Sequence, residues 1–87
     1  QKLKLAYQNA KSDYEYSIEQ YNSSKESLGL AERIENKQQI KFKEGLSSSF
    51  DFTEAQRQLY TSQQTYLQAM VDVINKKAAL EKIIGNQ

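Results

Sequence analysis

The chain has 87 residues, and its 12 Lys and Arg nearly balance its 11 Asp and Glu, which leaves a net charge of +1. That balance provides no basic face that could follow a phosphate backbone, so we do not expect nucleic acid as a partner. There is no His and no Cys, which removes the commonest general base and all thiol chemistry. We therefore expect no enzyme and no cofactor.

A metal site and a membrane-spanning helix are also not expected. Carboxylate pairs such as Glu15 with Glu19 share a helix face, but solvated surface charge explains them better than a metal site does. No apolar run approaches the roughly 20 residues that a helix needs to cross a bilayer. We therefore do not expect this segment to span a membrane.

The first predicted element is a long helix over residues of about 2–44. Its apolar and small residues recur at alternating steps of three and four, which is the seven-residue repeat of a coiled coil. Gly29 lies inside this helix, where it costs about 1 kcal/mol relative to Ala, so we expect it to mark a close approach between helices or a bend. The repeat passes through Leu3, Tyr7, Ala10, Tyr14, Ser17, Tyr21, Ser24, Leu28, Ala31, Glu35, Gln38 and Phe42.

The strongest break in the chain is residues 42–51, Phe-Lys-Glu-Gly-Leu-Ser-Ser-Ser-Phe-Asp. Gly45 can take the left-handed conformation that follows a helix C-terminus without a Cβ penalty, so we predict a turn over residues of about 45–48. Two starts remain open for the next helix. Ser48 with Asp51 has capping-box-like spacing, and Asp51 with Glu54 repeats that spacing one turn later.

The second predicted helix covers residues of about 49–84 and continues the seven-residue repeat. Folding the chain at the turn places Phe42 near Phe52 and Leu28 near Tyr66, so the two stripes meet. The predicted fold is all-α, with residues 1–87 forming a single long antiparallel two-helix coiled-coil hairpin. The second stripe comprises Phe52, Ala55, Leu59, Ser62, Tyr66, Ala69, Val73, Lys76, Leu80 and Ile83.

Several apolar residues lie off both stripes, and two helices alone cannot cover them, because each helix buries only one stripe against the other. We therefore expect further helices around this pair. The chain also opens inside an already periodic segment, so we interpret it as a fragment of a larger protein. The uncovered residues are Ile18, Leu30, Ile34, Ile40, Tyr60, Leu67, Val71, Ile74 and Ala78.

The turn and the start of the second helix resemble the periplasmic tip of the TolC family of outer-membrane efflux channels. The shared pattern is aromatic-x-x-Gly-Leu followed by Asp-x-x-x-Ala-Gln-x-x-Leu, which here spans residues 42–59. The ending from Leu80 to Gly85 looks like the second of the family's two repeats. The resemblance covers nearly the whole chain and implies a hairpin that forms part of a larger helical barrel, in a trimeric channel of the bacterial outer membrane. This segment would lie in the periplasm.

The resemblance also implies a docking role for the turn. In the family, the hairpin tips of the channel meet a periplasmic adaptor, also called a membrane fusion protein, and through it an inner-membrane pump. The matching positions here are Gly45, Leu46, Ser47 and Ser48. Chemically, Gly45 permits close backbone approach, and Leu46 offers an apolar anchor.

A second implied role is gating, in which carboxylates from the three subunits ring the entrance to the pore. Phe42, Asp51 and Glu54 match the family's gate positions. Ser47 stands where some relatives carry an Arg paired with such a carboxylate. Lys41 or Lys43 could supply the missing positive charge, although both also suit the negative end of the helix dipole.

Two alternatives remain open from the sequence. The chain could be the hairpin of the adaptor itself, which is also a long periplasmic coiled coil, although the Gly-Leu-Ser turn argues against it. It could instead be a structural coiled-coil hairpin unrelated to transport, which would explain the heptads but nothing about the turn. The sequence does not indicate the transported substrate.

Overall fold

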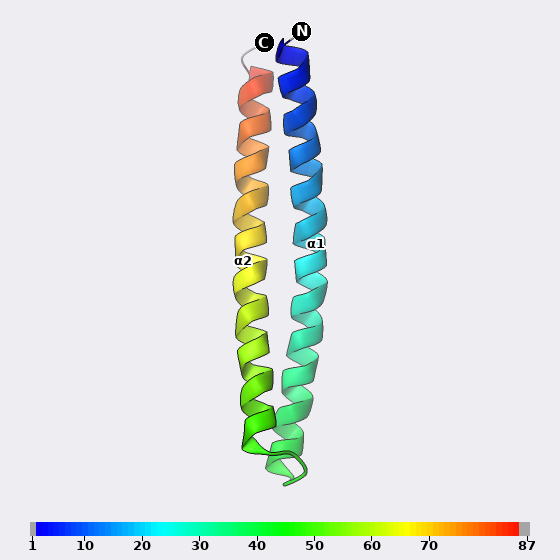
Figure 1. The fold of residues 1–87 in the computed structure, drawn as a ribbon, viewed down its shortest axis with the longest axis vertical. Helices are drawn as coiled ribbons and strands as arrows, with labels where there is room; N and C mark the ends of the chain where they lie inside the picture. The colour runs from blue at the N-terminus through cyan, green and yellow to red at the C-terminus, as the bar shows by residue number, and fades with distance from the viewer. Residues whose placement is uncertain (1, 86–87) are drawn as a thin grey trace.

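The computed structural model describes residues 2–85, which form two long helices joined by a short turn. Helix α1 is Lys2–Lys43 and helix α2 is Ser49–Gly85. They run antiparallel, so the first turn of α1 and the last turn of α2 lie at the same end of the rod (Figure 1). The predicted all-α hairpin is confirmed. The predicted span also includes Gln1, Asn86 and Gln87, which lie outside the described residues.

The rod measures 65 × 14 × 13 Å, so the contact between α1 and α2 is its only interior. The most buried residues are all small and all lie on the two predicted stripes: Ser17, Ser24, Ala31, Ala55 and Ala69. No large side chain is fully buried among the described residues. Small residues at these positions let the helices approach closely, but they remove little apolar surface from water. The contact, which we call the seam, is therefore narrow.

The other predicted seam positions are mostly half-buried, and two depart from the pattern. Lys76 is exposed, because its long side chain can keep the ammonium group in water. Phe42 is 42% exposed, although its ring still contacts α2. The side chain of Leu3 lies outside those described.

The buried serines of the seam satisfy their hydroxyl groups locally. The Ser17 hydroxyl donates to the carbonyl of Tyr14 at 2.6 Å, and the Ser24 hydroxyl donates to the carbonyl of Tyr21 at 2.8 Å. Each bond reaches back three residues along the same helix, which avoids the cost of an unpaired buried polar group. Serine can therefore replace alanine in this seam.

A pair of tyrosines joins the two helices near mid-length. The hydroxyl groups of Tyr21 and Tyr66 are 3.0 Å apart, and their ring centroids are 5.3 Å apart. This hydrogen bond to Tyr21 raises the pKa of the Tyr66 hydroxyl, because the bond favours the protonated form. Among residues 2–85 it is the one side-chain hydrogen bond between α1 and α2. It therefore reports directly on how the helices are aligned.

The sequence placed Tyr66 near Leu28 and did not predict its contact with Tyr21. At the tip, α1 and the turn extend beyond the first turn of α2 (Figure 1).

The Phe42–Phe52 contact at the tip is present as predicted, with ring centroids 5.3 Å apart and an interplanar angle of 27°. Helical side chains lean toward the N-terminus of their own helix, so Phe42 leans away from the tip and Phe52 leans toward it. The two rings meet and close the end of the seam.

The hairpin leaves most of the predicted off-seam apolar residues uncovered, and on α2 they form a second stripe. This stripe follows steps of three and four from Tyr60, and four of its side chains are about half exposed or more: Tyr60 at 63%, Leu67 at 50%, Val71 at 49% and Ile74 at 61%. On α1, Leu30, Ile34 and Ile40 are exposed, whereas Ile18 is half-buried. The expectation that two helices cannot cover this set is confirmed for all but Ile18.

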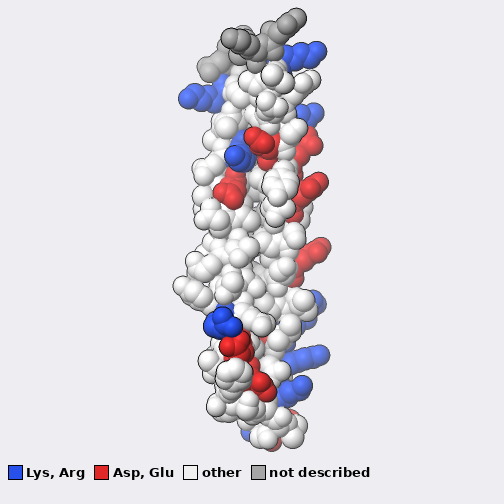
Figure 2. Space-filling model, in the orientation of Figure 1, with Lys and Arg blue, Asp and Glu red and all other residues white. Residues whose placement is uncertain are grey.

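On the face that Figure 2 shows, small mixed groups of charge lie in the middle, whereas along the right edge, below the basic side chains at the top end, acidic side chains lie in the upper half and basic side chains in the lower half. The ion pairs among residues 2–85 join Arg57 to Glu54 at 2.7 Å and Lys77 to Glu81 at 3.9 Å, and both are exposed. Exposed pairs of this kind contribute little to stability. No helix in the described part of the chain has both the length and the apolarity needed to cross a membrane.

Gly29 does not mark a close approach between the two helices, so that part of the expectation is wrong for the hairpin. A Cβ built at Gly29 would meet no atom within 4 Å. Helix α1 also continues through this position without interruption. Nothing within the hairpin therefore requires glycine here.

We expect Gly29→Ala to stabilise the protein by about 1 kcal/mol, because alanine loses less backbone freedom in a helix than glycine does. Thermal unfolding of the two forms, followed by circular dichroism, would measure the difference. A lower melting temperature for Gly29→Ala would contradict this expectation. It would show that another helix approaches Gly29 in the assembled protein.

Candidate functional site

The turn at the tip is built on Gly45, which adopts a φ of 74°. The Gly45 N–H donates to the Phe42 carbonyl at 3.1 Å, and the Leu46 N–H donates to the Lys41 carbonyl at 2.8 Å. These two bonds form a Schellman motif, which satisfies the last carbonyls of α1 and requires a left-handed residue. The predicted role of Gly45 at the end of the helix is therefore confirmed.

Ser48 begins α2 as its N-cap. The Ser48 hydroxyl accepts a hydrogen bond from the Asp51 N–H at 3.1 Å, and the Ser48 carbonyl accepts one from the Phe52 N–H at 3.2 Å. Of the two predicted starts, the one at Ser48 is correct and the one at Asp51 is wrong. Asp51 instead lies in the first turn of α2, where the positive end of the helix dipole favours a carboxylate.

Ser47 ties the turn back to α1. Its hydroxyl donates to Oε1 of Gln38 at 2.8 Å, and the side chain is half-buried. Both turn serines that the sequence assigned to docking therefore have partners inside the hairpin. Their hydroxyl groups hold the shape of the turn.

Two large apolar side chains at the tip remain uncovered. Leu46 is 73% exposed and Phe50 is 70% exposed, the highest values among the large apolar residues of the structure. The sequence assigned Leu46 to the tip but missed Phe50. A signal for Phe50 was available, because residues two apart on a helix differ by about 200° in direction. With Phe52 turned toward α1, Phe50 must point away from it.

The three predicted gate residues do not form one cluster. Phe42 lies on α1 and stacks on Phe52, so its ring closes the seam. Asp51 and Glu54 lie three residues apart on α2, which places both carboxylates on one face of that helix. Among the described residues, no group of three or more potential metal ligands is present.

Arg57 is the cation that pairs with Glu54, one of the two carboxylates that the sequence predicted for the gate, and the sequence did not predict this pair. Its Nη2 donates to Oε2 of Glu54 at 2.7 Å, and this bond lowers the pKa of the Glu54 carboxyl. The available signal was the three-residue spacing of Glu54 and Arg57 on a helix. Lys41 and Lys43, the predicted candidates, lie in the last turn of α1 and form no ion pair within residues 2–85.

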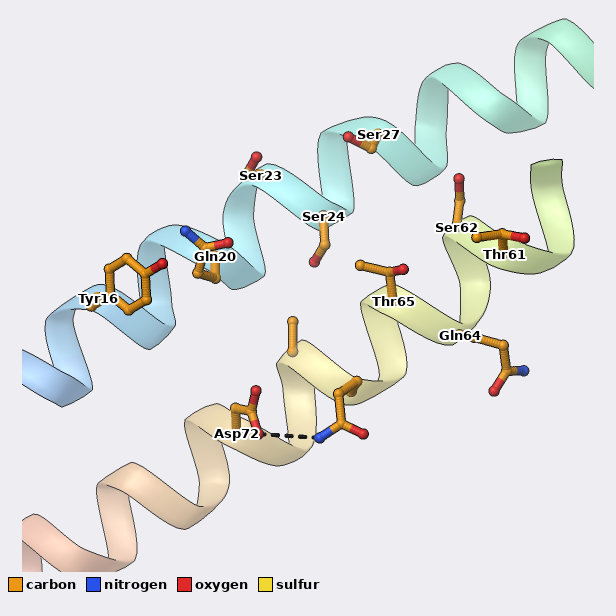
Figure 3. Close-up of a pocket in the computed structure, with 12 residues that line it drawn as sticks. Tyr16, Gln20, Ser23, Ser24, Ser27, Thr61, Ser62, Gln64, Thr65 and Asp72 are labelled. Atoms are coloured by element: carbon orange, nitrogen blue, oxygen red, sulfur yellow. Dashed lines mark hydrogen bonds between the residues drawn. The ribbon is translucent and has the colours of Figure 1, made fainter.

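An open groove runs along one side of the hairpin between α1 and α2 (Figure 3). Its lining consists almost entirely of hydroxyl and amide side chains, with Asp72 as the only charged group, and Nε2 of Gln68 donates to the Asp72 carboxylate at 3.2 Å. Such a surface can hydrogen-bond water or solutes of either charge without a strong Coulomb preference. The lining residues are Tyr16, Gln20, Ser23, Ser24 and Ser27 on α1, and Thr61, Ser62, Gln64, Thr65, Gln68, Ala69 and Asp72 on α2.

The groove and the two carboxylates predicted for the gate, Asp51 and Glu54, share one face of α2. Alternating steps of three and four lead from Asp51 into the groove, and every residue on that path is polar. This polar face differs from the apolar stripe that begins at Tyr60, so α2 carries distinct polar and apolar surfaces besides the seam. The path comprises Asp51, Glu54, Gln58, Thr61, Thr65, Gln68 and Asp72.

Comparison with known proteins gives one family. The model of the outer membrane efflux protein family matches residues 1–86. No curated protein and no solved structure matches the chain. The family match agrees with the resemblance carried by the turn motif.

We expect Gly45→Ala to destabilise the tip by about 1 kcal/mol, because an L-residue at a φ of 74° is strained even where its Cβ has space. Gly45→Asn is the matched control, since asparagine tolerates the left-handed region better. Denaturant unfolding of both variants would measure the two costs. Equal stability of Gly45→Ala and the unmodified protein would contradict the Schellman assignment.

Proposed function

Because the chain belongs to the outer membrane efflux protein family, we propose that it is the periplasmic tunnel-tip hairpin of a trimeric outer-membrane channel. The family is one of transport channels. In the proposal, this hairpin belongs to a longer protein, docks a periplasmic adaptor through its tip, and forms part of the entrance gate for efflux or type I secretion. Leu46, exposed on a turn that is fixed from both sides, is the observation that carries the docking role.

The tip suits a docking contact because it is both rigid and apolar. Gly45 and Ser48 fix the turn through backbone bonds, and Ser47 fixes it to Gln38. A turn fixed in this way loses little conformational freedom on binding, which favours affinity. Leu46 then presents an uncovered apolar side chain at the end of a 65 Å rod.

The uncovered stripe on α2 supports a place in a helical wall. Tyr60, Leu67, Val71 and Ile74 are exposed in the hairpin, and their seven-residue spacing suits a second helix packed alongside α2. In the proposed trimer, a neighbouring hairpin covers this stripe. The narrow seam alone buries little apolar surface, so such neighbours would also stabilise the hairpin.

The gate role rests on Asp51 and Glu54, which lie on one face of α2 near the tip. Three copies of this face around one axis would lower the local potential and favour cations at the entrance. The pairing of Glu54 with Arg57 offsets part of that charge, so Asp51 is the stronger contributor. The polar face that continues into the groove would extend along the same side of the transport path.

Docking can be tested with a photo-crosslinking amino acid at Leu46 of the full-length protein in cells. We expect capture of a periplasmic adaptor, because the side chain points away from the hairpin. Replacement of Gly45 by a bulky residue that preserves the trimer should reduce the capture, since the turn geometry changes.

Other products of that experiment would contradict the docking role. Capture of another subunit of the same channel, of other partners alone, or of no partner would contradict the docking role. None of these outcomes would change the family to which the chain belongs.

The gate can be tested by measuring ion selectivity of the full-length channel in planar bilayers at low salt, where screening is weak. We expect Asp51→Asn combined with Glu54→Gln to reduce the cation-to-anion permeability ratio by at least about twofold, because ring carboxylates concentrate cations. Glu81→Gln is a control, since Glu81 lies far from the tip and pairs with Lys77. An unchanged ratio in the double variant would exclude these carboxylates from the gate.

A further inference from the structure

Phe50 lies outside the contact between the two helices of the hairpin. It lies in the first turn of α2 and is 70% exposed, while the aromatic contact that closes the seam is made by Phe42 and Phe52. Its backbone is helical, so many polar residues could occupy this position, and none of them would expose an aromatic ring to water. An exposed ring of this size is a cost in solution and a gain once it is covered.

Leu46 is uncovered for a related reason. In a Schellman motif, the residue in its position commonly packs against the last turn of its own helix. Here that turn presents Ile40 and Lys41, both exposed, and Leu46 itself is 73% exposed. The local motif therefore fixes the backbone of Leu46 but leaves its side chain free.

The two side chains bracket the turn, with Leu46 at the end of α1 and Phe50 at the start of α2. Between them, the hydroxyl groups of Ser47 and Ser48 are already engaged with Gln38 and the Asp51 N–H. The large side chains that the turn leaves free to contact a partner, Leu46 and Phe50, are therefore apolar. Because the turn lies at the end of a rod (Figure 1), a partner must meet the hairpin end-on to reach both side chains.

We infer that Phe50 is a second apolar anchor of the docking tip, and that the adaptor carries an apolar pocket wide enough to cover Leu46 and Phe50 together. The inference rests on the proposed docking function and specifies the chemistry of that contact. Lys43 lies beside the α1 end of this pair and Asp51 beside the α2 end, and both are exposed. The adaptor surface should therefore place an acidic group near Lys43, at the polar rim around the pocket. Asp51 stays with the proposed gate.

The test places the same photo-crosslinking residue separately at Leu46, Phe50 and Tyr60 of the full-length protein in cells. Tyr60 is the control, because it is an aromatic residue on α2 that lies farther along the rod, on the stripe that a neighbouring hairpin covers in the proposed trimer. We expect Leu46 and Phe50 to capture the adaptor and Tyr60 not to. Capture from Leu46 but not from Phe50 would overturn this inference and leave the docking function standing.

The remaining crosslinking outcomes are also distinguishable. Capture of the adaptor from neither tip position would overturn both the inference and the docking function. Capture of a second copy of this chain from Phe50, without the adaptor, would assign the ring to contacts between channel subunits and overturn the inference alone.

Substitution provides a second readout. Phe50→Ser should reduce the adaptor co-purified with the trimer by at least about tenfold, as expected for loss of a buried aromatic anchor, whereas Phe50→Leu should retain most of it. The amount of trimer should stay unchanged in both variants, because Phe50 contacts little within the hairpin. Equal adaptor recovery for Phe50→Ser and the unmodified protein would overturn the inference.

Discussion

The narrow seam between α1 and α2 is the constraint on which the rest of the structure depends. Its buried positions are alanine and serine, so the helices approach closely and align over the full length of a 65 Å rod. The same choice of small residues limits the apolar area that the pair can remove from water. Length and alignment therefore come from the seam, while in the proposed assembly the surfaces that the hairpin leaves uncovered would add stabilisation by packing against neighbours.

At the tip, hydrogen bonds fix the backbone while two apolar side chains remain uncovered. The Schellman motif at Gly45 and the cap at Ser48 satisfy the helix ends, and the Phe42–Phe52 stack closes the seam just behind them. The hydroxyl groups of Ser47 and Ser48 are engaged within the hairpin. Leu46 and Phe50 remain outside them, so a rigid turn presents an apolar surface that has no partner within the hairpin.

Much of this arrangement could be predicted from the sequence, because helix ends and heptads are set by local chemistry. Gly45, Ser48 and the seam positions follow from capping rules and from spacing alone. The contact between Tyr21 and Tyr66 was not predicted, since the choice among neighbouring partners along the seam depends on side-chain directions that spacing does not encode. Phe50 and Arg57 lie off both the seam and the turn motif: the exposure of Phe50 follows from the direction of Phe52, and the pairing of Arg57 follows from its three-residue spacing from Glu54.

Helix α2 carries three surfaces of different chemistry, and this asymmetry links the fold to the proposed function. One surface packs on α1, one exposes Tyr60, Leu67 and Ile74, and one carries the polar face that runs from Asp51 into the groove. An isolated hairpin needs only the first, because a solvated helix would be polar everywhere else. A helix in the wall of a channel needs all three, since it has a neighbour on each side and water along the transport path. The two surfaces that the isolated fold does not use are therefore those that an assembled tunnel would require.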